Sequence, residues 1–175
     1  MDIETLRGLV RNHAGLTRKG PIAEVVAAIS ESKRFGEALP NYGDDAAVIP
    51  FGEEYLLFAA DGMMEGLLIN EPYAAGKASV MVTVNDIYAM GGRPLGMVNV
   101  MAAGDPEQRR LISEGIARGC EKLMVPMLGG HLHPDADPGH PALSVAILGR
   151  AQKVLRCHLA APGDDLVMAA DLTGR

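Results

Sequence analysis

The chain has 175 residues, of which 48% are hydrophobic and 22% charged, a balance typical of a folded globular domain. Its formal net charge of −6 argues against a surface built to bind nucleic acid or an anionic membrane. No apolar run reaches the roughly 18 residues that a membrane-spanning helix needs. Cys120 and Cys157 are too few for a disulfide framework, so we expect reduced structural thiols in a cytoplasmic protein.

Two short amphipathic helices are expected at the start of the chain. Asp2 can cap the first, over residues 2–13, whose apolar side chains fall on one face. Pro21 suits the first position of the second, in which residues 22–29 keep the i, i+3, i+4 spacing. Glycines at both ends of residues 15–20 predict a loop between the two helices.

Strands and longer helices alternate through the rest of the chain. Pro72 opens a helix that runs to about Met90 and ends at a glycine pair. Asp105, followed by proline and glutamate, is the N-cap of a second long helix. Apolar runs bounded by turn residues predict strands at 46–49, 55–60, 95–101, 127–130, 143–148 and 166–170.

Aspartates stand at several places where an unpaired carboxylate is costly, beside or inside apolar segments. They are Asp44, Asp45, Asp61 and Asp86. Carboxylates at strand ends and on a facing helix can converge on one point, and such hard oxygen ligands suit Mg²⁺ bridged to phosphates. The alternative is that Asp44 or Asp45 caps a turn and that Asp86 accepts backbone hydrogen bonds.

Other polar groups offer weaker signals. The pair Gly129-Gly130 follows a short apolar strand, where bare backbone N–H groups can approach a phosphate, although a simple turn explains it equally. His131 and His133, with acids nearby, could ligate Zn²⁺ or lie in an exposed polar loop. Lys19, in the glycine-bounded loop, could reach a phosphate or remain a solvated charge.

A family resemblance joins these motifs. In chain order they are Gly43-Asp44-Asp45-Ala46-Ala47-Val48, Ala60-Asp61-Gly62-Met63, Asn85-Asp86-Ile87-Tyr88-Ala89-Met90-Gly91-Gly92-Arg93-Pro94 and Gly129-Gly130-His131. This series resembles the N-terminal domain of the aminoimidazole ribonucleotide synthetase-like superfamily. Its members include that purine-pathway synthetase, thiamine-monophosphate kinase, selenophosphate synthetase and a hydrogenase maturation protein. The resemblance covers about residues 15–170, and the block from Asn85 to Pro94 is its most specific part.

The resemblance implies a fold and a chemistry. The fold is an α/β domain with a mixed, largely four-stranded sheet, covered by helices, that pairs with its twin in a homodimer. The chemistry is the use of ATP and Mg²⁺ to phosphorylate or activate a small molecule. Residues 1–160 would be the N-terminal ATP- and magnesium-binding and dimerisation domain. Residues 161–175 would begin a C-terminal domain that this chain lacks, since Pro162–Val167 resembles the entry into that domain.

The resemblance also implies roles for individual residues. Asp45, Asp61 and Asp86, with Asp44 beside them, match the metal-binding aspartates. Gly129 and Gly130 match the glycines near the nucleotide phosphates. As further nucleotide contacts we name His131 and Asn85, the latter orienting Asp86 or touching a phosphate. Lys19 would approach the transferred phosphoryl group, and Asp86 would be catalytic as well as metal-binding.

The motifs do not single out a substrate. His131 stands where the kinase members usually carry aspartate and matches the Gly-Gly-His of selenophosphate synthetase, yet the loop over residues 15–20 lacks that enzyme's reactive cysteine. We therefore expect the N-terminal domain of an ATP-dependent kinase or synthetase of unidentified substrate. The first alternative is an inactive nucleotide-binding and dimerisation module. A third is zinc-dependent hydrolysis at His131 and His133.

Overall fold

The fold consists of two units, Met1–Tyr42 and Gly43–Arg175. The computed structural model describes residues 1–36, 43–165 and 167–172. Within those ranges, no helix combines the length and the apolar character needed to cross a membrane.

The N-terminal unit is helical. Asp2 caps its first helix by accepting a hydrogen bond from the Thr5 backbone N–H at 2.9 Å, as the sequence predicts. Part of the expected loop over residues 15–20 is a helical turn instead, because the His13 side chain caps it by accepting from the Gly15 N–H. The elements are α1 (Ile3–Arg11), α2 (Ala14–Thr17), α3 (Ile22–Ile29) and η1 (Ser30–Phe35).

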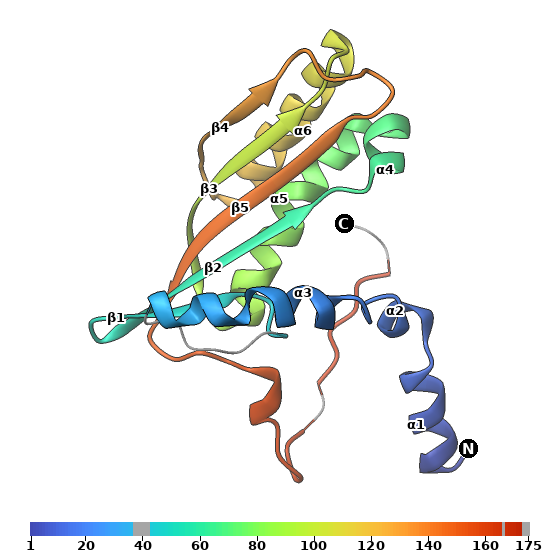
Figure 1. Ribbon diagram of the computed structural model, residues 1–175, viewed down its shortest axis with the longest axis vertical. Coiled ribbons are helices and arrows are strands. Elements are labelled where there is room, and N and C mark those ends of the chain that lie inside the picture. The colour runs from blue at the N-terminus through green and yellow to red at the C-terminus, as the bar shows by residue number, and fades with distance from the viewer. Residues whose placement is uncertain (37–42, 166, 173–175) are drawn as a thin grey trace. The chain divides into compact units, whose positions relative to one another are not determined.

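The second unit carries one sheet and three α-helices in its described part (Figure 1). The first long helix begins and ends close to where the sequence predicts it, and the second begins as predicted, with Asp105 capping it by accepting from the Gln108 N–H at 2.6 Å. The elements are β1 (Ala47–Phe51), β2 (Glu54–Gly62), α4 (Glu65–Asn70), α5 (Pro72–Ala89), β3 (Arg93–Ala102), α6 (Pro106–Leu123), β4 (Met127–His133), β5 (Ala142–Ala151) and η2 (Cys157–Leu159).

The sheet is mixed and has five strands in the order β1-β2-β5-β3-β4. Strands β3 and β4 run parallel, joined by α6, and the other neighbours are antiparallel. Strand β1, predicted from the apolar run at 46–49, forms an edge hairpin with β2 through Gly52 at a φ of 62°, and the sheet has one strand more than the four that the resemblance implies. The strand expected at 166–170 is wrong over 167–170, which form no ladder with the described strands; Leu166 lies outside the described residues.

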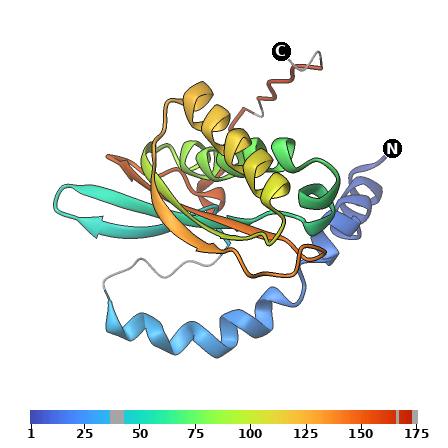
Figure 2. The same ribbon diagram turned by 90° about the horizontal axis from the view of Figure 1, so that it is seen from above.

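Helices α4, α5 and α6 cover one face of the sheet, as the view from above shows (Figure 2). Strand alternation sends side chains such as Val145 and Ile147 into the core beneath these helices. The residues between them point to the opposite face, where Phe58 and Leu148 are 48% and 37% exposed. The sheet of this unit thus has one packed face and one open, apolar face.

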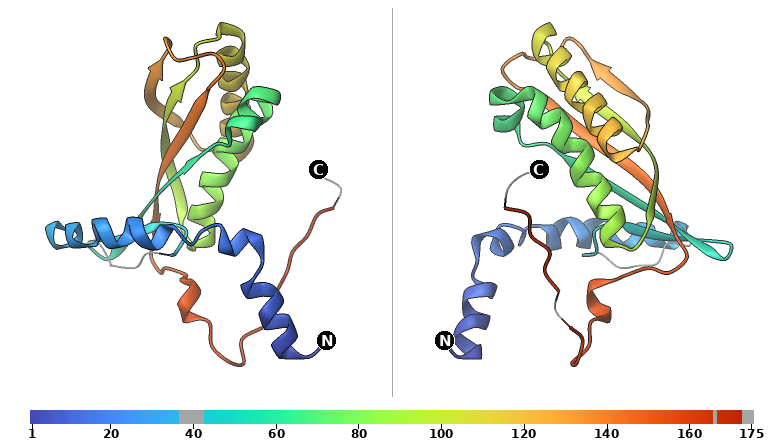
Figure 3. Two further views of the ribbon diagram at one scale, coloured as in Figure 1. Left: turned by 45° about the vertical axis from the view of Figure 1, so that its right-hand side comes forward. Right: turned by 180° about the vertical axis from the view of Figure 1, so that it is seen from behind.

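Helices α5 and α6 lie side by side with their backbones in direct contact (Figure 3). A Cβ at Gly76 would lie 2.1 Å from the Ile112 carbonyl oxygen, and a Cβ at Gly115 would lie 2.1 Å from that of Tyr73. Only glycine permits so close an approach at these two positions. The contact fixes α5, which carries Asn85 and Asp86, against its neighbour.

Candidate metal and phosphate site

Three of the predicted aspartates lie close together in the second unit. Asp45 stands two residues before β1, whose first residue, Ala47, pairs with Phe58 of β2. Asp61 lies near the end of β2, and Asp86 lies in the last turns of α5, which packs on β2. The two strand ends and the helix therefore bring the three carboxylates together, as the sequence predicts.

The charges of these aspartates repel one another. The pKa of Asp86 is raised to about 6, because burial disfavours its charged form and because the carboxylates of Asp45 and Asp61 are near. Across the described ranges, no lysine, arginine or histidine forms an ion pair with any of the three. A group of carboxylate oxygens, partly buried at Asp86 and exposed at Asp45 and Asp61, without an ion-pairing cation in the described residues is a donor set that fits Mg²⁺.

Asp44 has a different environment from the other three. Its side chain is only 1% exposed and accepts a hydrogen bond from Arg156 Nε at 2.7 Å, with further bonds from the backbone N–H and thiol of Cys157. Burial raises the pKa of Asp44, but these donors outweigh it and hold that pKa below its usual range. Asp44 is absent from the charges that raise the pKa of Asp86. It joins the end of β5 to the start of β1, beside the acidic group.

A cavity of about 310 Å³ adjoins this junction, lined by residues that include Asp45, Met90 and Arg156. Arg156, Cys157 and His158 are absent from the sequence-based site, because they lie more than 100 residues from Asp44 and belong to no motif. One ligand atom each of Asp44, Cys157 and His158 lies within 4.8 Å of the others. The Asp44 carboxylate, however, is already bound to a guanidinium.

Gly129, Gly130 and His131 lie elsewhere on the sheet. They belong to β4, which β3 and β5 separate from β2, so about 14 Å of sheet divides them from the aspartates. They line a cavity of about 590 Å³ that also contains Asn99 and Arg109. Within this chain the glycines and the aspartates therefore do not share one cavity.

The remaining predicted site residues lie in both units. Asn85 is exposed on α5 beside Asp86, and Lys19 is exposed between α2 and α3 in the N-terminal unit. The rings of His131 and His133 lie edge to face with their centroids 4.6 Å apart. Among the residues that the structure describes, these histidines belong to no group of three ligands, so no zinc site forms there.

Comparison with models of known protein families identifies the family of this chain. The family model described as "AIR synthase related protein, N-terminal domain" matches residues 43–151, which include all four aspartates. The chain belongs to this family. Family membership confirms the resemblance drawn from the motifs, and the matched range runs from the Gly-Asp-Asp motif through the last residue of β5.

Relatives of this AIR synthase-related domain include proteins with and without an assigned activity. An uncharacterized protein of Synechocystis is 41% identical over 140 residues, which cover 80% of this chain and 42% of the relative. A selenide, water dikinase of Carboxydothermus hydrogenoformans is 31% identical over 135 residues, 75% of this chain and 39% of the relative. The chain spans about half the length of the curated relatives it matches.

Solved structures confirm the fold of the AIR synthase-related domain. The structure of AaThiL complexed with AMPPCP and TMP superimposes with a TM-score of 0.63 at 22% identity, over 77% of this chain and 42% of that one. The mixed sheet flanked by helices is therefore an arrangement that the domain shares with AIR synthetase-like proteins.

Proposed function

We propose that this AIR synthase-related domain binds ATP through Mg²⁺ held by Asp45, Asp61 and Asp86, as the N-terminal domain of an ATP-dependent small-molecule kinase or synthetase. The observation that carries the proposal is that Asp45 and Asp61 lie near the partly buried Asp86 with no ion-pairing cation among the described residues; burial first, and then these two charges, raise the pKa of Asp86. Related proteins support it, since one solved neighbour is a complex with AMPPCP and one relative is a dikinase.

In this proposal each residue has a limited task. The three carboxylates hold the cation, which when bound neutralises phosphate charge. Asp44 holds the chain before β1 in place through Arg156, and the α5–α6 contact fixes Asp86. Asn85, next to Asp86, contacts a phosphate or orients that carboxylate. Gly129, Gly130 and His131 contact the nucleotide from β4, and Lys19 approaches the transferred phosphoryl group.

We also propose that two copies pair through their open sheet faces. The support is the apolar surface opposite the helices, which carries exposed Phe58, Val98, Val100 and Leu148 on three neighbouring strands. An exposed patch of this kind marks a surface for association, and two sheets pack well face to face. A cytoplasmic homodimer acting on an unidentified small molecule is then the complete proposal.

Titration calorimetry with AMPPCP, with and without Mg²⁺, tests the nucleotide site. We expect binding that depends on Mg²⁺, weakened at least about tenfold by Asp86→Asn, because a lost metal ligand costs no less than a lost supporting contact. Asp135→Asn, in an exposed loop, is the matched control and should bind like the wild type. Equal binding by Asp86→Asn and the wild type would refute the assignment.

Catalysis requires a second assay, which compares ATP turnover by this chain with turnover by a full-length relative. We expect the chain to bind nucleotide and the longer protein to turn it over. Nucleotide binding without turnover in either protein would favour the inactive nucleotide-binding and dimerisation module.

A further inference from the structure

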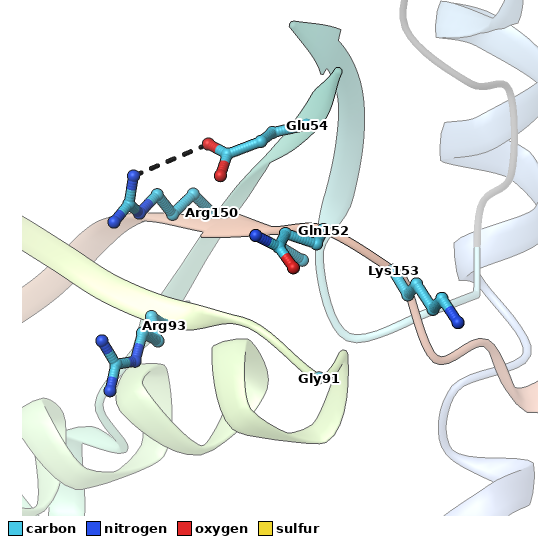
Figure 4. Close-up of a pocket in the computed structure, with 7 residues that line it drawn as sticks. Glu54, Gly91, Arg93, Arg150, Gln152 and Lys153 are labelled. Carbon is cyan, nitrogen blue, oxygen red and sulfur yellow. Dashed lines mark ion pairs between the residues drawn. The ribbon is translucent and has the colours of Figure 1, made fainter. Parts of the chain in front are cut away.

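A cluster of cationic side chains lies at the end of the sheet where β3 begins and β5 ends. A cavity of about 520 Å³ there is lined by Arg93, Arg150 and Lys153, with Glu54 as the carboxylate among its lining residues (Figure 4). Gln152 also lines this cavity. This concentration of positive charge belongs to a chain whose formal net charge is −6.

The two arginines occupy paired positions on neighbouring strands. Arg93 of β3 and Arg150 of β5 are direct Cα partners in an antiparallel pair, which places both side chains on the same face. Figure 4 shows the Arg150 side chain directed toward Glu54 and the end of the Arg93 side chain pointing away from Glu54. Like charges directly opposite each other destabilise a sheet, and a bound anion would offset this repulsion.

The protein itself neutralises little of this charge. Arg150 forms an ion pair with Glu54 at 3.6 Å, a long and exposed contact. Within the described ranges, the side chains of Arg93 and Lys153 have no hydrogen-bond or ion-pair partner. Both guanidinium groups therefore keep N–H donors that can bind the oxygens of a phosphate.

The cavity is built on fixed backbone. The Leu155 N–H donates to the Met90 carbonyl oxygen at 3.0 Å, which ties the chain after β5 to the end of α5. Gly91, at a φ of 75°, leaves room for Leu155 against this turn. The same junction separates this cavity from the one that contains Asp45, so the basic and acidic cavities are distinct.

The geometry points to a binding site for the phosphate group of a small phosphate monoester, held by Arg93 and Arg150 with Lys153 at the edge. The positive charge favours an anion, and the N–H donors of two guanidinium groups favour one with several oxygens, such as phosphate. A volume of about 520 Å³ leaves space for an organic group beyond the phosphate. This site does not rest on the proposed ATP and Mg²⁺ function, because it uses none of the aspartates.

Calorimetric titration with glycerol 3-phosphate in the presence of EDTA tests the site, since the chelator removes any contribution from divalent cations. Inorganic phosphate, glycerol and succinate are the comparison ligands. We expect both phosphates to bind, glycerol not to bind, and succinate to bind more weakly than either phosphate. Absence of phosphate binding, or succinate binding as tight as phosphate, overturns the proposal.

Variants locate the binding. Arg93→Gln and Arg150→Gln should each weaken glycerol 3-phosphate binding about tenfold, the usual effect of losing one charge-assisted contact. Arg93→Lys should bind glycerol 3-phosphate with an affinity between those of the wild type and Arg93→Gln, because lysine keeps the charge and loses the guanidinium donors. Arg118→Gln, an exposed arginine of α6, is the control and should bind normally. Unchanged binding in both glutamine variants overturns the proposal.

Two further measurements distinguish a lost binding site from a lost fold and from a lost contact between copies. Circular dichroism and thermal melting show whether each variant is folded. If an arginine variant does not fold, Lys153→Gln replaces it in the binding test and should show a smaller loss of phosphate affinity, because Lys153 lies at the edge of the cavity. Light scattering reports the mass of each variant. Normal phosphate binding together with a changed mass in Arg93→Gln would assign the arginines to contacts between copies instead, which contradicts the proposal.

Discussion

Arg156 donates a hydrogen bond from Nε to the Asp44 carboxylate at 2.7 Å, and the two side chains are only 15% and 1% exposed. The pair closes a loop of more than 100 residues and connects the chain after β5 to the chain before β1. Asp44 and Asp45 are neighbours with separate tasks, since one anchors the backbone and the other faces Asp61 and Asp86.

Replacing Arg156 with glutamine should leave the Asp44 carboxylate buried without its cation. Removing one partner of a buried ion pair destabilises a protein by about 3 kcal/mol or more. We expect a loss near that lower value, because the Arg156 guanidinium still contacts solvent. Urea unfolding at pH 7 measures the loss in free energy of unfolding. The double variant Asp44→Asn/Arg156→Gln should recover part of it, and a single variant as stable as the wild type would contradict the role of the pair.

The same pair makes a prediction for acid. Hydrogen bonds from Arg156 and Cys157 hold the pKa of Asp44 below its usual 3.8. A lowered pKa in the folded state stabilises the protein above the unfolded pKa, and this contribution is lost as pH falls through the lowered value. Asp44→Asn should therefore show a weaker loss of stability than the wild type below about pH 4, measured by urea unfolding across that range.

Asp86 should give the opposite pH dependence in metal-free protein. Its pKa in the folded state is about 6, above the ordinary 3.8, mainly because of burial and then because of Asp45 and Asp61. Protonation therefore favours the folded state, so this contribution is present at low pH and is lost as pH rises through about 6.

Urea unfolding in EDTA at pH 5 and pH 7.5 measures this effect. We expect Asp86→Asn to lose less stability between the two pH values than the wild type, because asparagine does not ionise. Added Mg²⁺ should raise the stability of the wild type at pH 7.5 and leave Asp86→Asn nearly unchanged. If the stability of the two proteins changed with pH in the same way, the raised pKa of Asp86 would be contradicted.

The neighbouring glycines of β4 should differ sharply when changed to alanine. A Cβ at Gly130 would lie 2.5 Å from Asn99 Oδ1 and 2.6 Å from the Asn99 carbonyl oxygen, whereas a Cβ at Gly129 would meet nothing within 4 Å. We expect Gly130→Ala to lose about 1–3 kcal/mol of stability through overpacking. Gly129→Ala should stay within about 0.5 kcal/mol of the wild type.

Chemical unfolding of both variants checks the difference, and nucleotide titration adds a functional measurement. If the Gly129 backbone contacts the nucleotide, Gly129→Ala should weaken AMPPCP binding while keeping wild-type stability. Similar stability in the two variants would show that Gly130 has more room than the structure gives it.

The open sheet face predicts an oligomeric state that a charge should disrupt. Val100 is 49% exposed on this face, beside other apolar side chains. Light scattering should give a dimer for the wild type and a monomer for Val100→Glu, with the same circular dichroism spectrum, because a buried glutamate at a sheet-to-sheet contact is costly. Met124→Glu, at an 89% exposed position after α6, is the control and should remain dimeric.

The sequence predicts elements well where local chemistry marks their ends. Asp105 and the following proline predict α6, and the cap is present. The sequence patterns do not predict α4, because Met64 at its N-terminus forms no side-chain cap. The apolar run over 167–170 satisfies the strand pattern but pairs with no described strand, and a strand forms only on a partner.

The residues around the candidate site also include some that the sequence could predict and some that it could not. Asp45, Asp61 and Asp86 could be predicted, because each is an acid beside an apolar segment whose pairing brings it toward the others. Arg156 could not, since its partner lies far along the chain and no spacing connects them. The distance between the glycines of β4 and the aspartates depends on strand order, which the motifs do not contain.

The glycines between α5 and α6 also govern how the domain moves. Because Gly76 and Gly115 bring the two helix backbones into contact, neither helix can slide past the other without a collision between main chains. The helix pair therefore moves as one rigid body, and shear motion between its members is blocked. Asp86, near the end of α5, is therefore held on a helix whose position is fixed by its neighbour.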